Sequence, residues 1–291
     1  MVAGSVKNPF VVLEIGCNHK GDISIAKNLI HEAADAGASA VKFQKRNIFE
    51  CMSEEQRNAP HPNPANSYGR TYGEHRAFLE LDIEVHRHLK EFAESLGLVY
   101  SSSVFDITSA REIVSLNPSY IKVASAQNNN TELLLWLCRN YEGEIQVSLG
   151  MTTRKEEDAI IDIFTKCGRM SSLTLLACTS GYPVSSEDAC LLEISRIRQM
   201  YGYAVKRVGI SGHYLSTAID IAAYTLGAEV IERHFTHDKS WKGTDHIASL
   251  VMDEAKALIR DLNEVHKALT YKSAEIIPVE EASRKKLKFR G

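Results

Sequence analysis

Short apolar segments alternate with amphipathic segments along most of the chain, and this alternation limits the fold more than any other feature. Eight apolar runs are each followed by a segment in which apolar residues recur at helical spacing. The later runs are apolar throughout, as strands buried on both faces of a parallel sheet are. The predicted strands are 10–15, 40–44, 98–102, 120–123, 145–149, 173–177 and the apolar runs within 208–214 and 230–236.

Eight strand–helix units in about 250 residues are typical of a (β/α)8 TIM barrel. The alternative is a doubly wound open sheet, which predicts a G-x-G-x-x-G phosphate turn after the first strand. The turn here is Gly16-Cys-Asn-His-Lys-Gly21, which does not match. We therefore predict an α/β protein with a (β/α)8 TIM barrel over residues 1–270 and a C-terminal tail over 271–291.

Helical spacing and capping signals set the expected helices, and one connection is unusually long. The predicted helices are 22–36, 83–95, 109–116, 132–140, 155–167, 187–201, 215–226 and 253–269. An insertion at about 47–81, rich in Pro, Asn, Tyr and His, follows the second predicted strand. Structureless connections of this length are usually functional or mobile. Within it, His75 or Arg76 could reach a substrate, or the segment could lead a surface helix.

Composition excludes several classes of protein. The 291 residues are 44% apolar and 24% charged, and the net charge of −3 provides no basic field for nucleic acid. No apolar run approaches the ~20 residues that span a bilayer, and we expect no membrane association. Six cysteines without a CxxC pair are typical of reduced thiols, so we expect a cytoplasmic protein.

Two histidines end the last two predicted strands. His213 and His234 would lie at the same end of neighbouring parallel strands, beside Glu232 and close to Asp245. Neutral imidazoles in such a pair can bind a divalent metal. The alternative is two unrelated histidines, one in the core and one at the surface.

Two lysines lie inside apolar strands, close to the strand ends where barrel enzymes build their sites. Lys42 and Lys122 must each be paired or meet an anion, because a buried charge without a partner is costly. A pair with Glu14 would satisfy one of them. Two lysines together with serines at other strand ends indicate a phosphate or carboxylate ligand.

Seven motifs in order resemble the sialic acid synthase family, and the resemblance covers nearly the whole chain. The motifs are Glu14-Ile-Gly-Cys-Asn-His-Lys-Gly, Val41-Lys-Phe-Gln, Ile121-Lys-Val-Ala-Ser, Ser148-Leu-Gly-Met, Cys178-Thr-Ser-Gly-Tyr-Pro, Gly209-Ile-Ser-Gly-His and Ile231-Glu-Arg-His-Phe-Thr. The resemblance implies a (β/α)8 barrel that condenses phosphoenolpyruvate with N-acetylmannosamine or a close relative. The products would be a nonulosonic (sialic) acid and phosphate, and the cofactor a divalent metal, Mn²⁺ or Mg²⁺.

The resemblance also implies a role for each matching residue. His213 and His234 resemble the metal ligands. Catalytic roles fall on Glu14, Lys42, Lys122 and Gln127. Substrate binding falls on Gln44, Asn66, Ser103, Ser125, Ser148, Ser180, Tyr182, Ser211 and Asp245. Within these sets, the two lysines and the serines match the phosphoenolpyruvate site, and the others apart from Gln127 match the sugar site.

The chain departs from the family pattern in several places. Gln127 replaces a Glu, and an amide cannot take a proton. Gly212 stands where the family has an Asp, and Ser180 where it has an Asn. Family members usually continue into a C-terminal antifreeze-like domain that reads the acetamido group of the partner subunit's substrate.

These departures leave alternatives open. The acceptor could be a non-acetylated or phosphorylated aldose, or the protein could bind phosphorylated ligands without turnover. Family members are dimers, so we expect a homo-oligomer.

Overall fold

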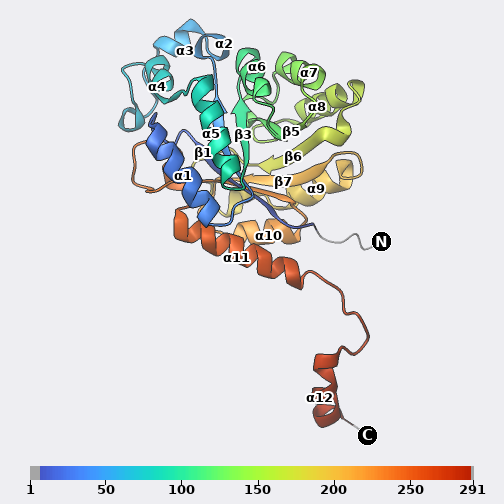
Figure 1. Cartoon of the computed structure of the whole chain (residues 1–291). Helices are drawn as coiled ribbons and strands as arrows, with labels where there is room; N and C mark the ends of the chain where they lie inside the picture. Colours follow the sequence, from blue (N-terminus) through green and yellow to red (C-terminus); the bar gives the residue numbers. More distant parts are fainter. Residues whose placement is uncertain (1–6, 290–291) are drawn as a thin grey trace.

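The computed structural model describes residues 7–289, and its centre is a closed barrel of eight parallel strands in sequence order (Figure 1). Helices follow the strands and lie around the barrel, so the predicted (β/α)8 TIM barrel is confirmed. The strands are β1 (Phe10–Gly16), β2 (Ala40–Lys45), β3 (Val99–Val104), β4 (Tyr120–Val123), β5 (Glu144–Ser148), β6 (Leu173–Cys178), β7 (Arg207–Gly212) and β8 (Val230–His234).

The pairing register of the strands determines which side chains meet inside the barrel. Glu14 of β1 is the Cα partner of Lys42 on β2 and also of His234 on β8, where the barrel closes. Ser211 of β7 pairs with Glu232 of β8 in the same way. The register therefore brings carboxylates, a lysine and a histidine to one level of the barrel before any loop is considered.

Polar residues cap the helices that hold the strands in place. The Asp22 side chain accepts hydrogen bonds from the backbone N–H groups of Ser24 and Ile25, as predicted for the first helix. Thr153 begins a later helix with a capping box to Glu156. The helices around the barrel are α1 (Ile23–Asp35), α5 (Ile83–Ser95), α6 (Ile107–Ser115), α7 (Thr131–Asn140), α8 (Arg154–Lys166), α9 (Leu192–Tyr201), α10 (Ala218–Thr225) and α11 (Met252–Ala268).

Apolar packing closes one end of the barrel and leaves the other end to polar residues. The main hydrophobic core fills the space between the strands and the helices around them. A second, small cluster lies mostly at the beginnings of the strands and consists of Val12, Ala40, Tyr120, Leu176 and Val230. Because this cluster is fully buried, a ligand can approach only from the C-terminal ends of the strands.

The insertion is not the structureless connection that the sequence led us to expect. It folds into α2 (Ile48–Cys51), α3 (Glu54–Asn58), the 3-10 turn η1 (Pro64–Asn66) and α4 (Tyr72–Leu79). Reciprocal capping boxes begin α3 at Ser53 and α4 at Thr71, and these compensate for the short length of the helices. The prediction relied on the content of Pro, Asn and Tyr and did not consider Ser53 and Thr71 as helix caps.

Two contacts attach the insertion to the loop after β8. The hydroxyl of Tyr68 donates a hydrogen bond to the carbonyl of Lys242 at 2.5 Å. The side-chain oxygen of Asn66 accepts from the backbone N–H of Gly243 at 3.4 Å. Figure 1 shows α2, α3 and α4 together at one side of the barrel mouth. The insertion therefore forms a wall of the mouth.

Several predicted boundaries were wrong; among them, the helix expected from residue 109 begins at Ile107. The helix expected from residue 187 is interrupted, because Cys190 adopts a left-handed backbone with φ of 49° after a 3-10 turn, and α9 begins only at Leu192. The helix expected from residue 215 begins at Ala218. Strand β3 extends to Val104, two residues further than predicted, so Ser103 lies within the strand.

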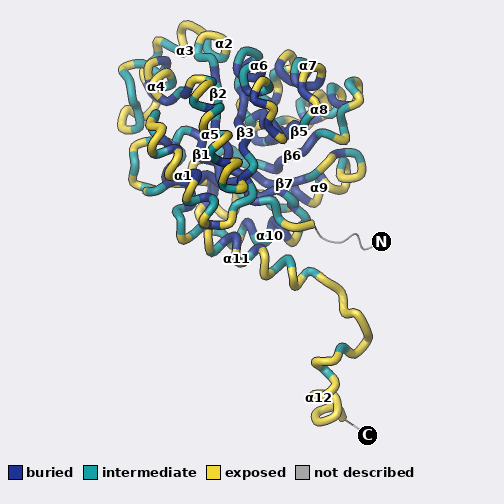
Figure 2. Tube along the Cα trace, in the orientation of Figure 1, coloured by how far each residue is buried: buried dark blue, intermediate teal, exposed yellow. Residues whose placement is uncertain are grey.

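The segment after α11 holds one more helix, α12 (Pro278–Leu287), which the sequence did not lead us to expect. It stands away from the barrel in Figure 1, and Figure 2 shows it almost entirely exposed. Glu280 and Glu281 in its first turn and Arg284 in its last turn suit the helix dipole and favour this helix. Between residues 7 and 289, no helix combines the length and apolarity needed to cross a membrane.

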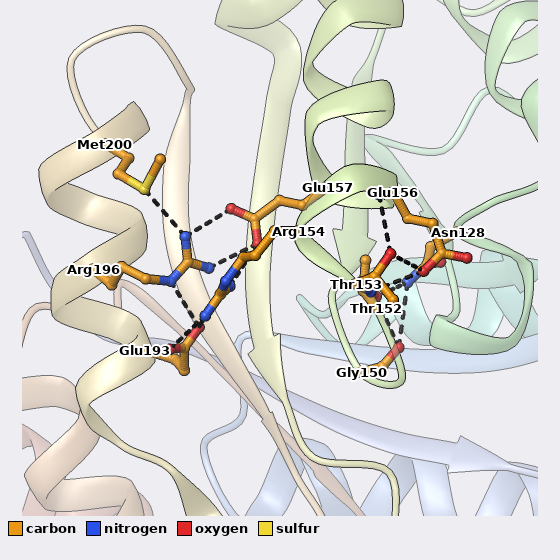
Figure 3. Close-up of polar contacts among 10 residues, drawn as sticks. All are labelled: Asn128, Gly150, Thr152, Thr153, Arg154, Glu156, Glu157, Glu193, Arg196 and Met200. Atoms are coloured by element: carbon orange, nitrogen blue, oxygen red, sulfur yellow. Dashed lines mark hydrogen bonds and ion pairs between the residues drawn. The ribbon is translucent and has the colours of Figure 1, made fainter.

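An ion-pair network joins α8 to α9 outside β5 and β6 (Figure 3). Arg196 contacts Glu157 at 2.7 Å and Glu193 at 2.8 Å, and Arg154 contacts the same two carboxylates at 2.9 Å. Burial alone would raise the pKa of Glu157, but hydrogen bonds from Arg196 and Arg154 hold it below its usual value. The network fixes the helix that follows the β5 loop.

Candidate active site

A cavity of about 960 Å³, including its open mouth, lies at the C-terminal end of the barrel. Every strand contributes at least one polar side chain to its lining. The structure brings together most residues that the sequence proposed for the site. Those that line the cavity are Glu14, Lys42, Gln44, Ser103, Lys122, Ser125, Ser148, Ser180, Tyr182, Ser211, His213, His234 and Asp245.

Each buried lysine has a carboxylate partner. The ammonium of Lys42 contacts the Glu14 carboxylate and donates a hydrogen bond to Ser103 Oγ at 2.8 Å. Lys122 contacts Glu232 and donates to Ser211 Oγ at 3.2 Å. The Lys–Glu pair considered from the sequence therefore occurs twice, with a serine hydroxyl beside each pair.

The two carboxylates differ in electrostatic environment. Burial would raise the pKa of Glu232, but Lys122 in contact and Lys42 at 3.8 Å hold it at about 2. Burial raises the pKa of Glu14, and Lys42 offsets this only in part. Glu232 is thus a fixed negative charge, whereas Glu14 is the carboxylate in the cavity that can more readily exchange a proton.

Two serine hydroxyls and the Cys178 sulfur surround Gly150 just after β5. A Cβ atom at Gly150 would come within 2.7 Å of Ser125 Oγ and closer still to Ser180 Oγ, so only glycine fits here. The backbone N–H of Gly150 donates to Ser125 Oγ at 3.1 Å. Ser148 Oγ is buried and has no hydrogen-bond partner. A buried hydroxyl without a partner indicates a ligand position, and hydroxyls near Lys122 suit an oxyanion.

The two histidines both line the cavity, and their rings are tilted by 41° to each other. The ring centroids of His213 and His234 are 5.4 Å apart, and that of Tyr182 is 4.4 Å from His213. His234 Nδ1 is buried without a hydrogen-bond partner. Burial, with His234 beside it, lowers the pKa of His213 to about 3, so its imidazole is neutral and has a free lone pair.

This donor set fits a divalent metal that keeps open positions. Across residues 7–289, no group of three or more His, Cys, Asp and Glu side chains is close enough to hold a metal ion. Two imidazoles, one with an unpartnered nitrogen, would leave the remaining coordination positions to water or substrate.

A second set of polar residues lies on the side of the mouth next to the insertion. Gln44 donates to Glu14 Oε1 at 3.2 Å. The Arg76 guanidinium donates to the Tyr72 hydroxyl at 3.0 and 2.7 Å but has no ion pair with any described carboxylate. Burial would raise the pKa of Asp245, yet His234 and Arg76 keep it below its usual value.

Two residues proposed from the sequence do not line the cavity. Gln127 lies in the 3-10 turn η2 (Ser125–Gln127) after β4, and its side-chain oxygen accepts a hydrogen bond from Asn130 at 3.1 Å. Asn66 contacts Gly243, in the loop that carries Asp245, and thus supports the cavity wall from outside.

Four further residues line the cavity: Arg46, Arg76, Cys178 and Glu232. From the sequence, Arg76 entered only in one of two interpretations of the insertion and Glu232 only as a neighbour of the histidines, and Arg46 and Cys178 had no predicted role. Glu232 could have been found, because it precedes His234 by two positions in a strand and so shares its face. The place of Arg76 depends on how the insertion folds against the barrel, and no local sequence signal contains that information.

Comparisons with known proteins show which family the chain belongs to. The model of the NeuB family matches residues 29–274. The mouse protein "N-acetylneuraminate-9-phosphate synthase" is 34% identical over 97% of this chain and 77% of its own length. The "N,N'-diacetyllegionaminic acid synthase" of Legionella pneumophila is 34% identical over 91% of this chain and 74% of its own length.

A solved structure shares the fold over almost its whole length. The N-acetylneuraminic acid (sialic acid) synthetase of Leptospira borgpetersenii, in complex with citrate, superposes with a TM-score of 0.79 at 27% identity. The match covers 98% of this chain and 94% of the other. Together with the matching family model, these similarities show that the chain belongs to the NeuB family of sialic-type acid synthases.

Proposed function

We propose that the protein condenses phosphoenolpyruvate with a sugar aldehyde, N-acetylmannosamine or a close relative, to give a nonulosonic acid and phosphate. The single observation that carries the proposal is one cavity that holds a lysine–serine cradle beside a histidine pair. The lysines and serines suit an anionic donor, and the histidine pair suits a metal that activates a carbonyl. The names of the family relatives support the same reaction class.

The donor would bind in the half of the cavity nearest β3 to β7. Its phosphate would lie against Lys122, Ser148 and Ser180, and its carboxylate against Lys42 and Ser103. Both lysines are already paired with glutamates, so the site is close to neutral without ligand. When the trianionic donor binds, each lysine ammonium would form an ion pair with the donor, and its ion pair with glutamate would weaken.

The acceptor would bind between Gln44, Tyr182 and Asp245, with its aldehyde towards the histidine pair. A divalent metal held by His213 and His234, Mn²⁺ or Mg²⁺ in this proposal, would supply Lewis acidity at the aldehyde oxygen. The neutral imidazole of His213 and the buried, unpartnered Nδ1 of His234 favour that role.

Carbon 3 of phosphoenolpyruvate attacks the aldehyde carbon, and positive charge develops at carbon 2. Glu14 lies between Lys42, Gln44 and His234 and is placed to stabilise that charge. A water adds at carbon 2 and loses a proton, for which Glu14 is the candidate acceptor because burial raises its pKa. The aldehyde oxygen, which gains the electron pair of its carbonyl, takes that proton and becomes a hydroxyl. The tetrahedral intermediate then passes the proton of its carbon 2 hydroxyl to the departing inorganic phosphate and leaves the 2-keto acid.

A phosphorylated acceptor is a second candidate, and Arg76 is the observation that favours it. Its guanidinium lines the acceptor side of the cavity without a carboxylate partner. A phosphate on the far end of the sugar would pair with it. The relatives include a synthase of a 9-phosphate product and a synthase of an unphosphorylated one at the same 34% identity, so the names do not decide.

Phosphate release from phosphoenolpyruvate tests both candidates. The assay would use Mn²⁺ and compare N-acetylmannosamine, its 6-phosphate, mannose and arabinose 5-phosphate, with His213→Ala alongside. Release that depends on one sugar, on Mn²⁺ and on His213 supports the proposal. Preference for the 6-phosphate that disappears in Arg76→Gln supports the second candidate. Binding of phosphoenolpyruvate without release with any sugar would favour a phospho-ligand-binding protein.

The proposal extends to the organisation of the chain. We propose residues 1–270 as the catalytic unit with 271–291 as a tail, a homo-oligomeric state, and a cytoplasmic location. All six cysteines are free, which supports a reducing compartment. Light scattering of the purified protein would test the oligomeric state.

A further inference from the structure

The loop after β5 presents Ser148 to the cavity. It runs from Ser148 to Thr153, where α8 begins, and Met151 within it adopts a left-handed backbone with φ of 55°. A non-glycine residue in that conformation costs free energy, so other contacts must hold the loop. On its outer side, α8 is fixed to α9 by the ion pairs of Arg154 and Glu157 (Figure 3).

Asn128 provides the contacts on the inner side. Its side-chain nitrogen lies 2.8 Å from the carbonyl of Ser148, 3.4 Å from that of Gly150 and 2.6 Å from Thr152 Oγ1. Figure 3 shows the Asn128 amide pointing at Gly150 and Thr152 from the neighbouring turn. The side chain is 3% exposed and does not line the cavity.

The hydrogen-bond acceptors around the Asn128 side chain require a neutral N–H donor at this position, which an amide provides. The nitrogen is surrounded by two carbonyl oxygens and one hydroxyl, and the Thr152 hydroxyl itself donates to the carbonyl of Gly150 at 2.9 Å. A carboxylate at this position would meet carbonyl oxygens while buried, which is costly. An alanine would leave these acceptors without their donor.

The same turn carries donor-binding groups. Asn128 follows the turn of Ser125, and Ser125 Oγ accepts from the N–H of Gly150. The two bonds attach the end of β4, with Lys122, to the loop that presents Ser148. These hydrogen bonds therefore determine how the Lys122 ammonium lies relative to the Ser148 hydroxyl.

We propose that Asn128 is a positioning residue that fixes the Ser148–Gly150 loop against the β4 turn and so sets affinity for the phosphate of the donor. The inference rests on the proposed function, in that the donor is taken to be phosphoenolpyruvate. Asn128 acts through Ser148 and Gly150 and does not itself touch substrate. Affinity for the sugar does not depend on it.

Steady-state phosphate release and calorimetric binding of phosphoenolpyruvate, on the full chain with Mn²⁺, test this inference. Asn128→Ala is expected to raise KM and Kd for phosphoenolpyruvate about tenfold, the value for one lost buried hydrogen-bond donor. KM for the sugar should change less than about twofold, and Asn128→Asp should weaken donor binding more than Asn128→Ala.

Asn129→Ala is the matched control, since Asn129 is the exposed next residue and contacts only Glu156 at 3.3 Å. It should behave as wild type. Thr152→Val keeps the shape of the loop but removes one partner, and its effect on donor Kd should combine non-additively with that of Asn128→Ala.

A lower melting temperature for Asn128→Ala with unchanged KM and Kd for phosphoenolpyruvate would reduce the residue to a structural role and overturn the inference. Equal weakening of donor and sugar would overturn it as well. If Asn128→Ala does not fold, Thr152→Val tests the inference instead. A larger rise in KM for phosphoenolpyruvate than in KM for the sugar would support it, and equal changes would overturn it. Wild-type protein that binds phosphoenolpyruvate without turnover would contradict the proposed function while leaving the Kd comparison valid. Wild-type protein that does not bind phosphoenolpyruvate would contradict both.

Discussion

Glu232 lies between the two buried lysines of the active site, in contact with Lys122 and 3.8 Å from Lys42. In the absence of substrate, Lys122 therefore depends on this carboxylate for charge balance, whereas Lys42 has Glu14 in contact. A buried ion pair adds little stability by itself, but removing one partner leaves a charge without compensation. The same lysines are the proposed contacts of an anionic donor, so an anion can take the place of the carboxylate.

Glu232→Gln is expected to lower the free energy of unfolding by about 3–5 kcal/mol, the cost of breaking a buried pair. Inorganic phosphate should raise the melting temperature of the variant more than that of the wild type, because the variant has an unmet positive charge. Thermal unfolding of both proteins in sulfate-free buffer, with and without phosphate, measures the loss of stability and the rise in melting temperature. An equal phosphate shift in the two proteins would show that the lysines do not bind the anion.

Gln127→Glu is expected to change kcat/KM by less than about threefold. The Gln127 side chain faces Asn130 rather than the cavity, and a carboxylate oxygen can accept the same hydrogen bond. Steady-state kinetics with saturating metal would check this. A large gain in kcat would mean that the turn rearranges to bring residue 127 to the substrates.

The sequence predicted the inward-facing residues of the strands well, because strand alternation and parallel register fix them. Glu14, Lys42 and His234 meet as expected, since they are register partners. The positions of side chains on turns were predicted less well. Gln127 was assigned by motif, but the side chain of a 3-10 turn can point either way, and a hydrogen bond to Asn130 decides its direction.

At the level of secondary structure, the insertion is the part of the molecule whose fold the sequence predicted least. Its helices are too short to be stable alone, so their arrangement depends on capping and on contacts with the barrel. Such contacts join residues more than 170 positions apart, as Tyr68 and Lys242 are, and no local pattern reveals them. Composition marked the insertion, whereas its fold and the cavity wall it forms could not be predicted.

Tyr68→Phe is expected to loosen the insertion without unfolding the barrel. The loss of one hydrogen bond is worth about 1 kcal/mol, which is small against global stability but a larger share of the free energy that holds this one segment against the barrel. Limited proteolysis should cut faster within 47–81, and KM for the sugar should rise several-fold more than KM for phosphoenolpyruvate. Tyr203→Phe, at an 88% exposed position, is the control. Unchanged cleavage would mean that other contacts hold the insertion.

At the scale of the whole molecule, buried neutral histidines determine how stability depends on pH. Burial lowers the pKa of His86 to about 3 and that of His19 to about 4. Unfolding exposes these rings and returns them to a pKa near 6.5. Below that pH the unfolded state binds protons that the folded state refuses, so stability is fully present above pH ~6.5 and falls as the pH drops towards the folded pKa values.

The contribution of His86 can be isolated, because its ring contacts the hydroxyl of Tyr100 at 2.5 Å and both groups can be removed together. In His86→Leu/Tyr100→Phe, the free energy of unfolding should fall less steeply between pH 6.5 and 4.5, by about 1.4 kcal/mol per pH unit, the value for one proton. Urea unfolding at several pH values measures the slope. His88→Gln, at an exposed position on the same helix, should keep the wild-type slope. A slope unchanged in the double variant would mean that His86 is protonated in the folded protein, and that acid sensitivity arises from the carboxylate–lysine pairs of the barrel mouth instead.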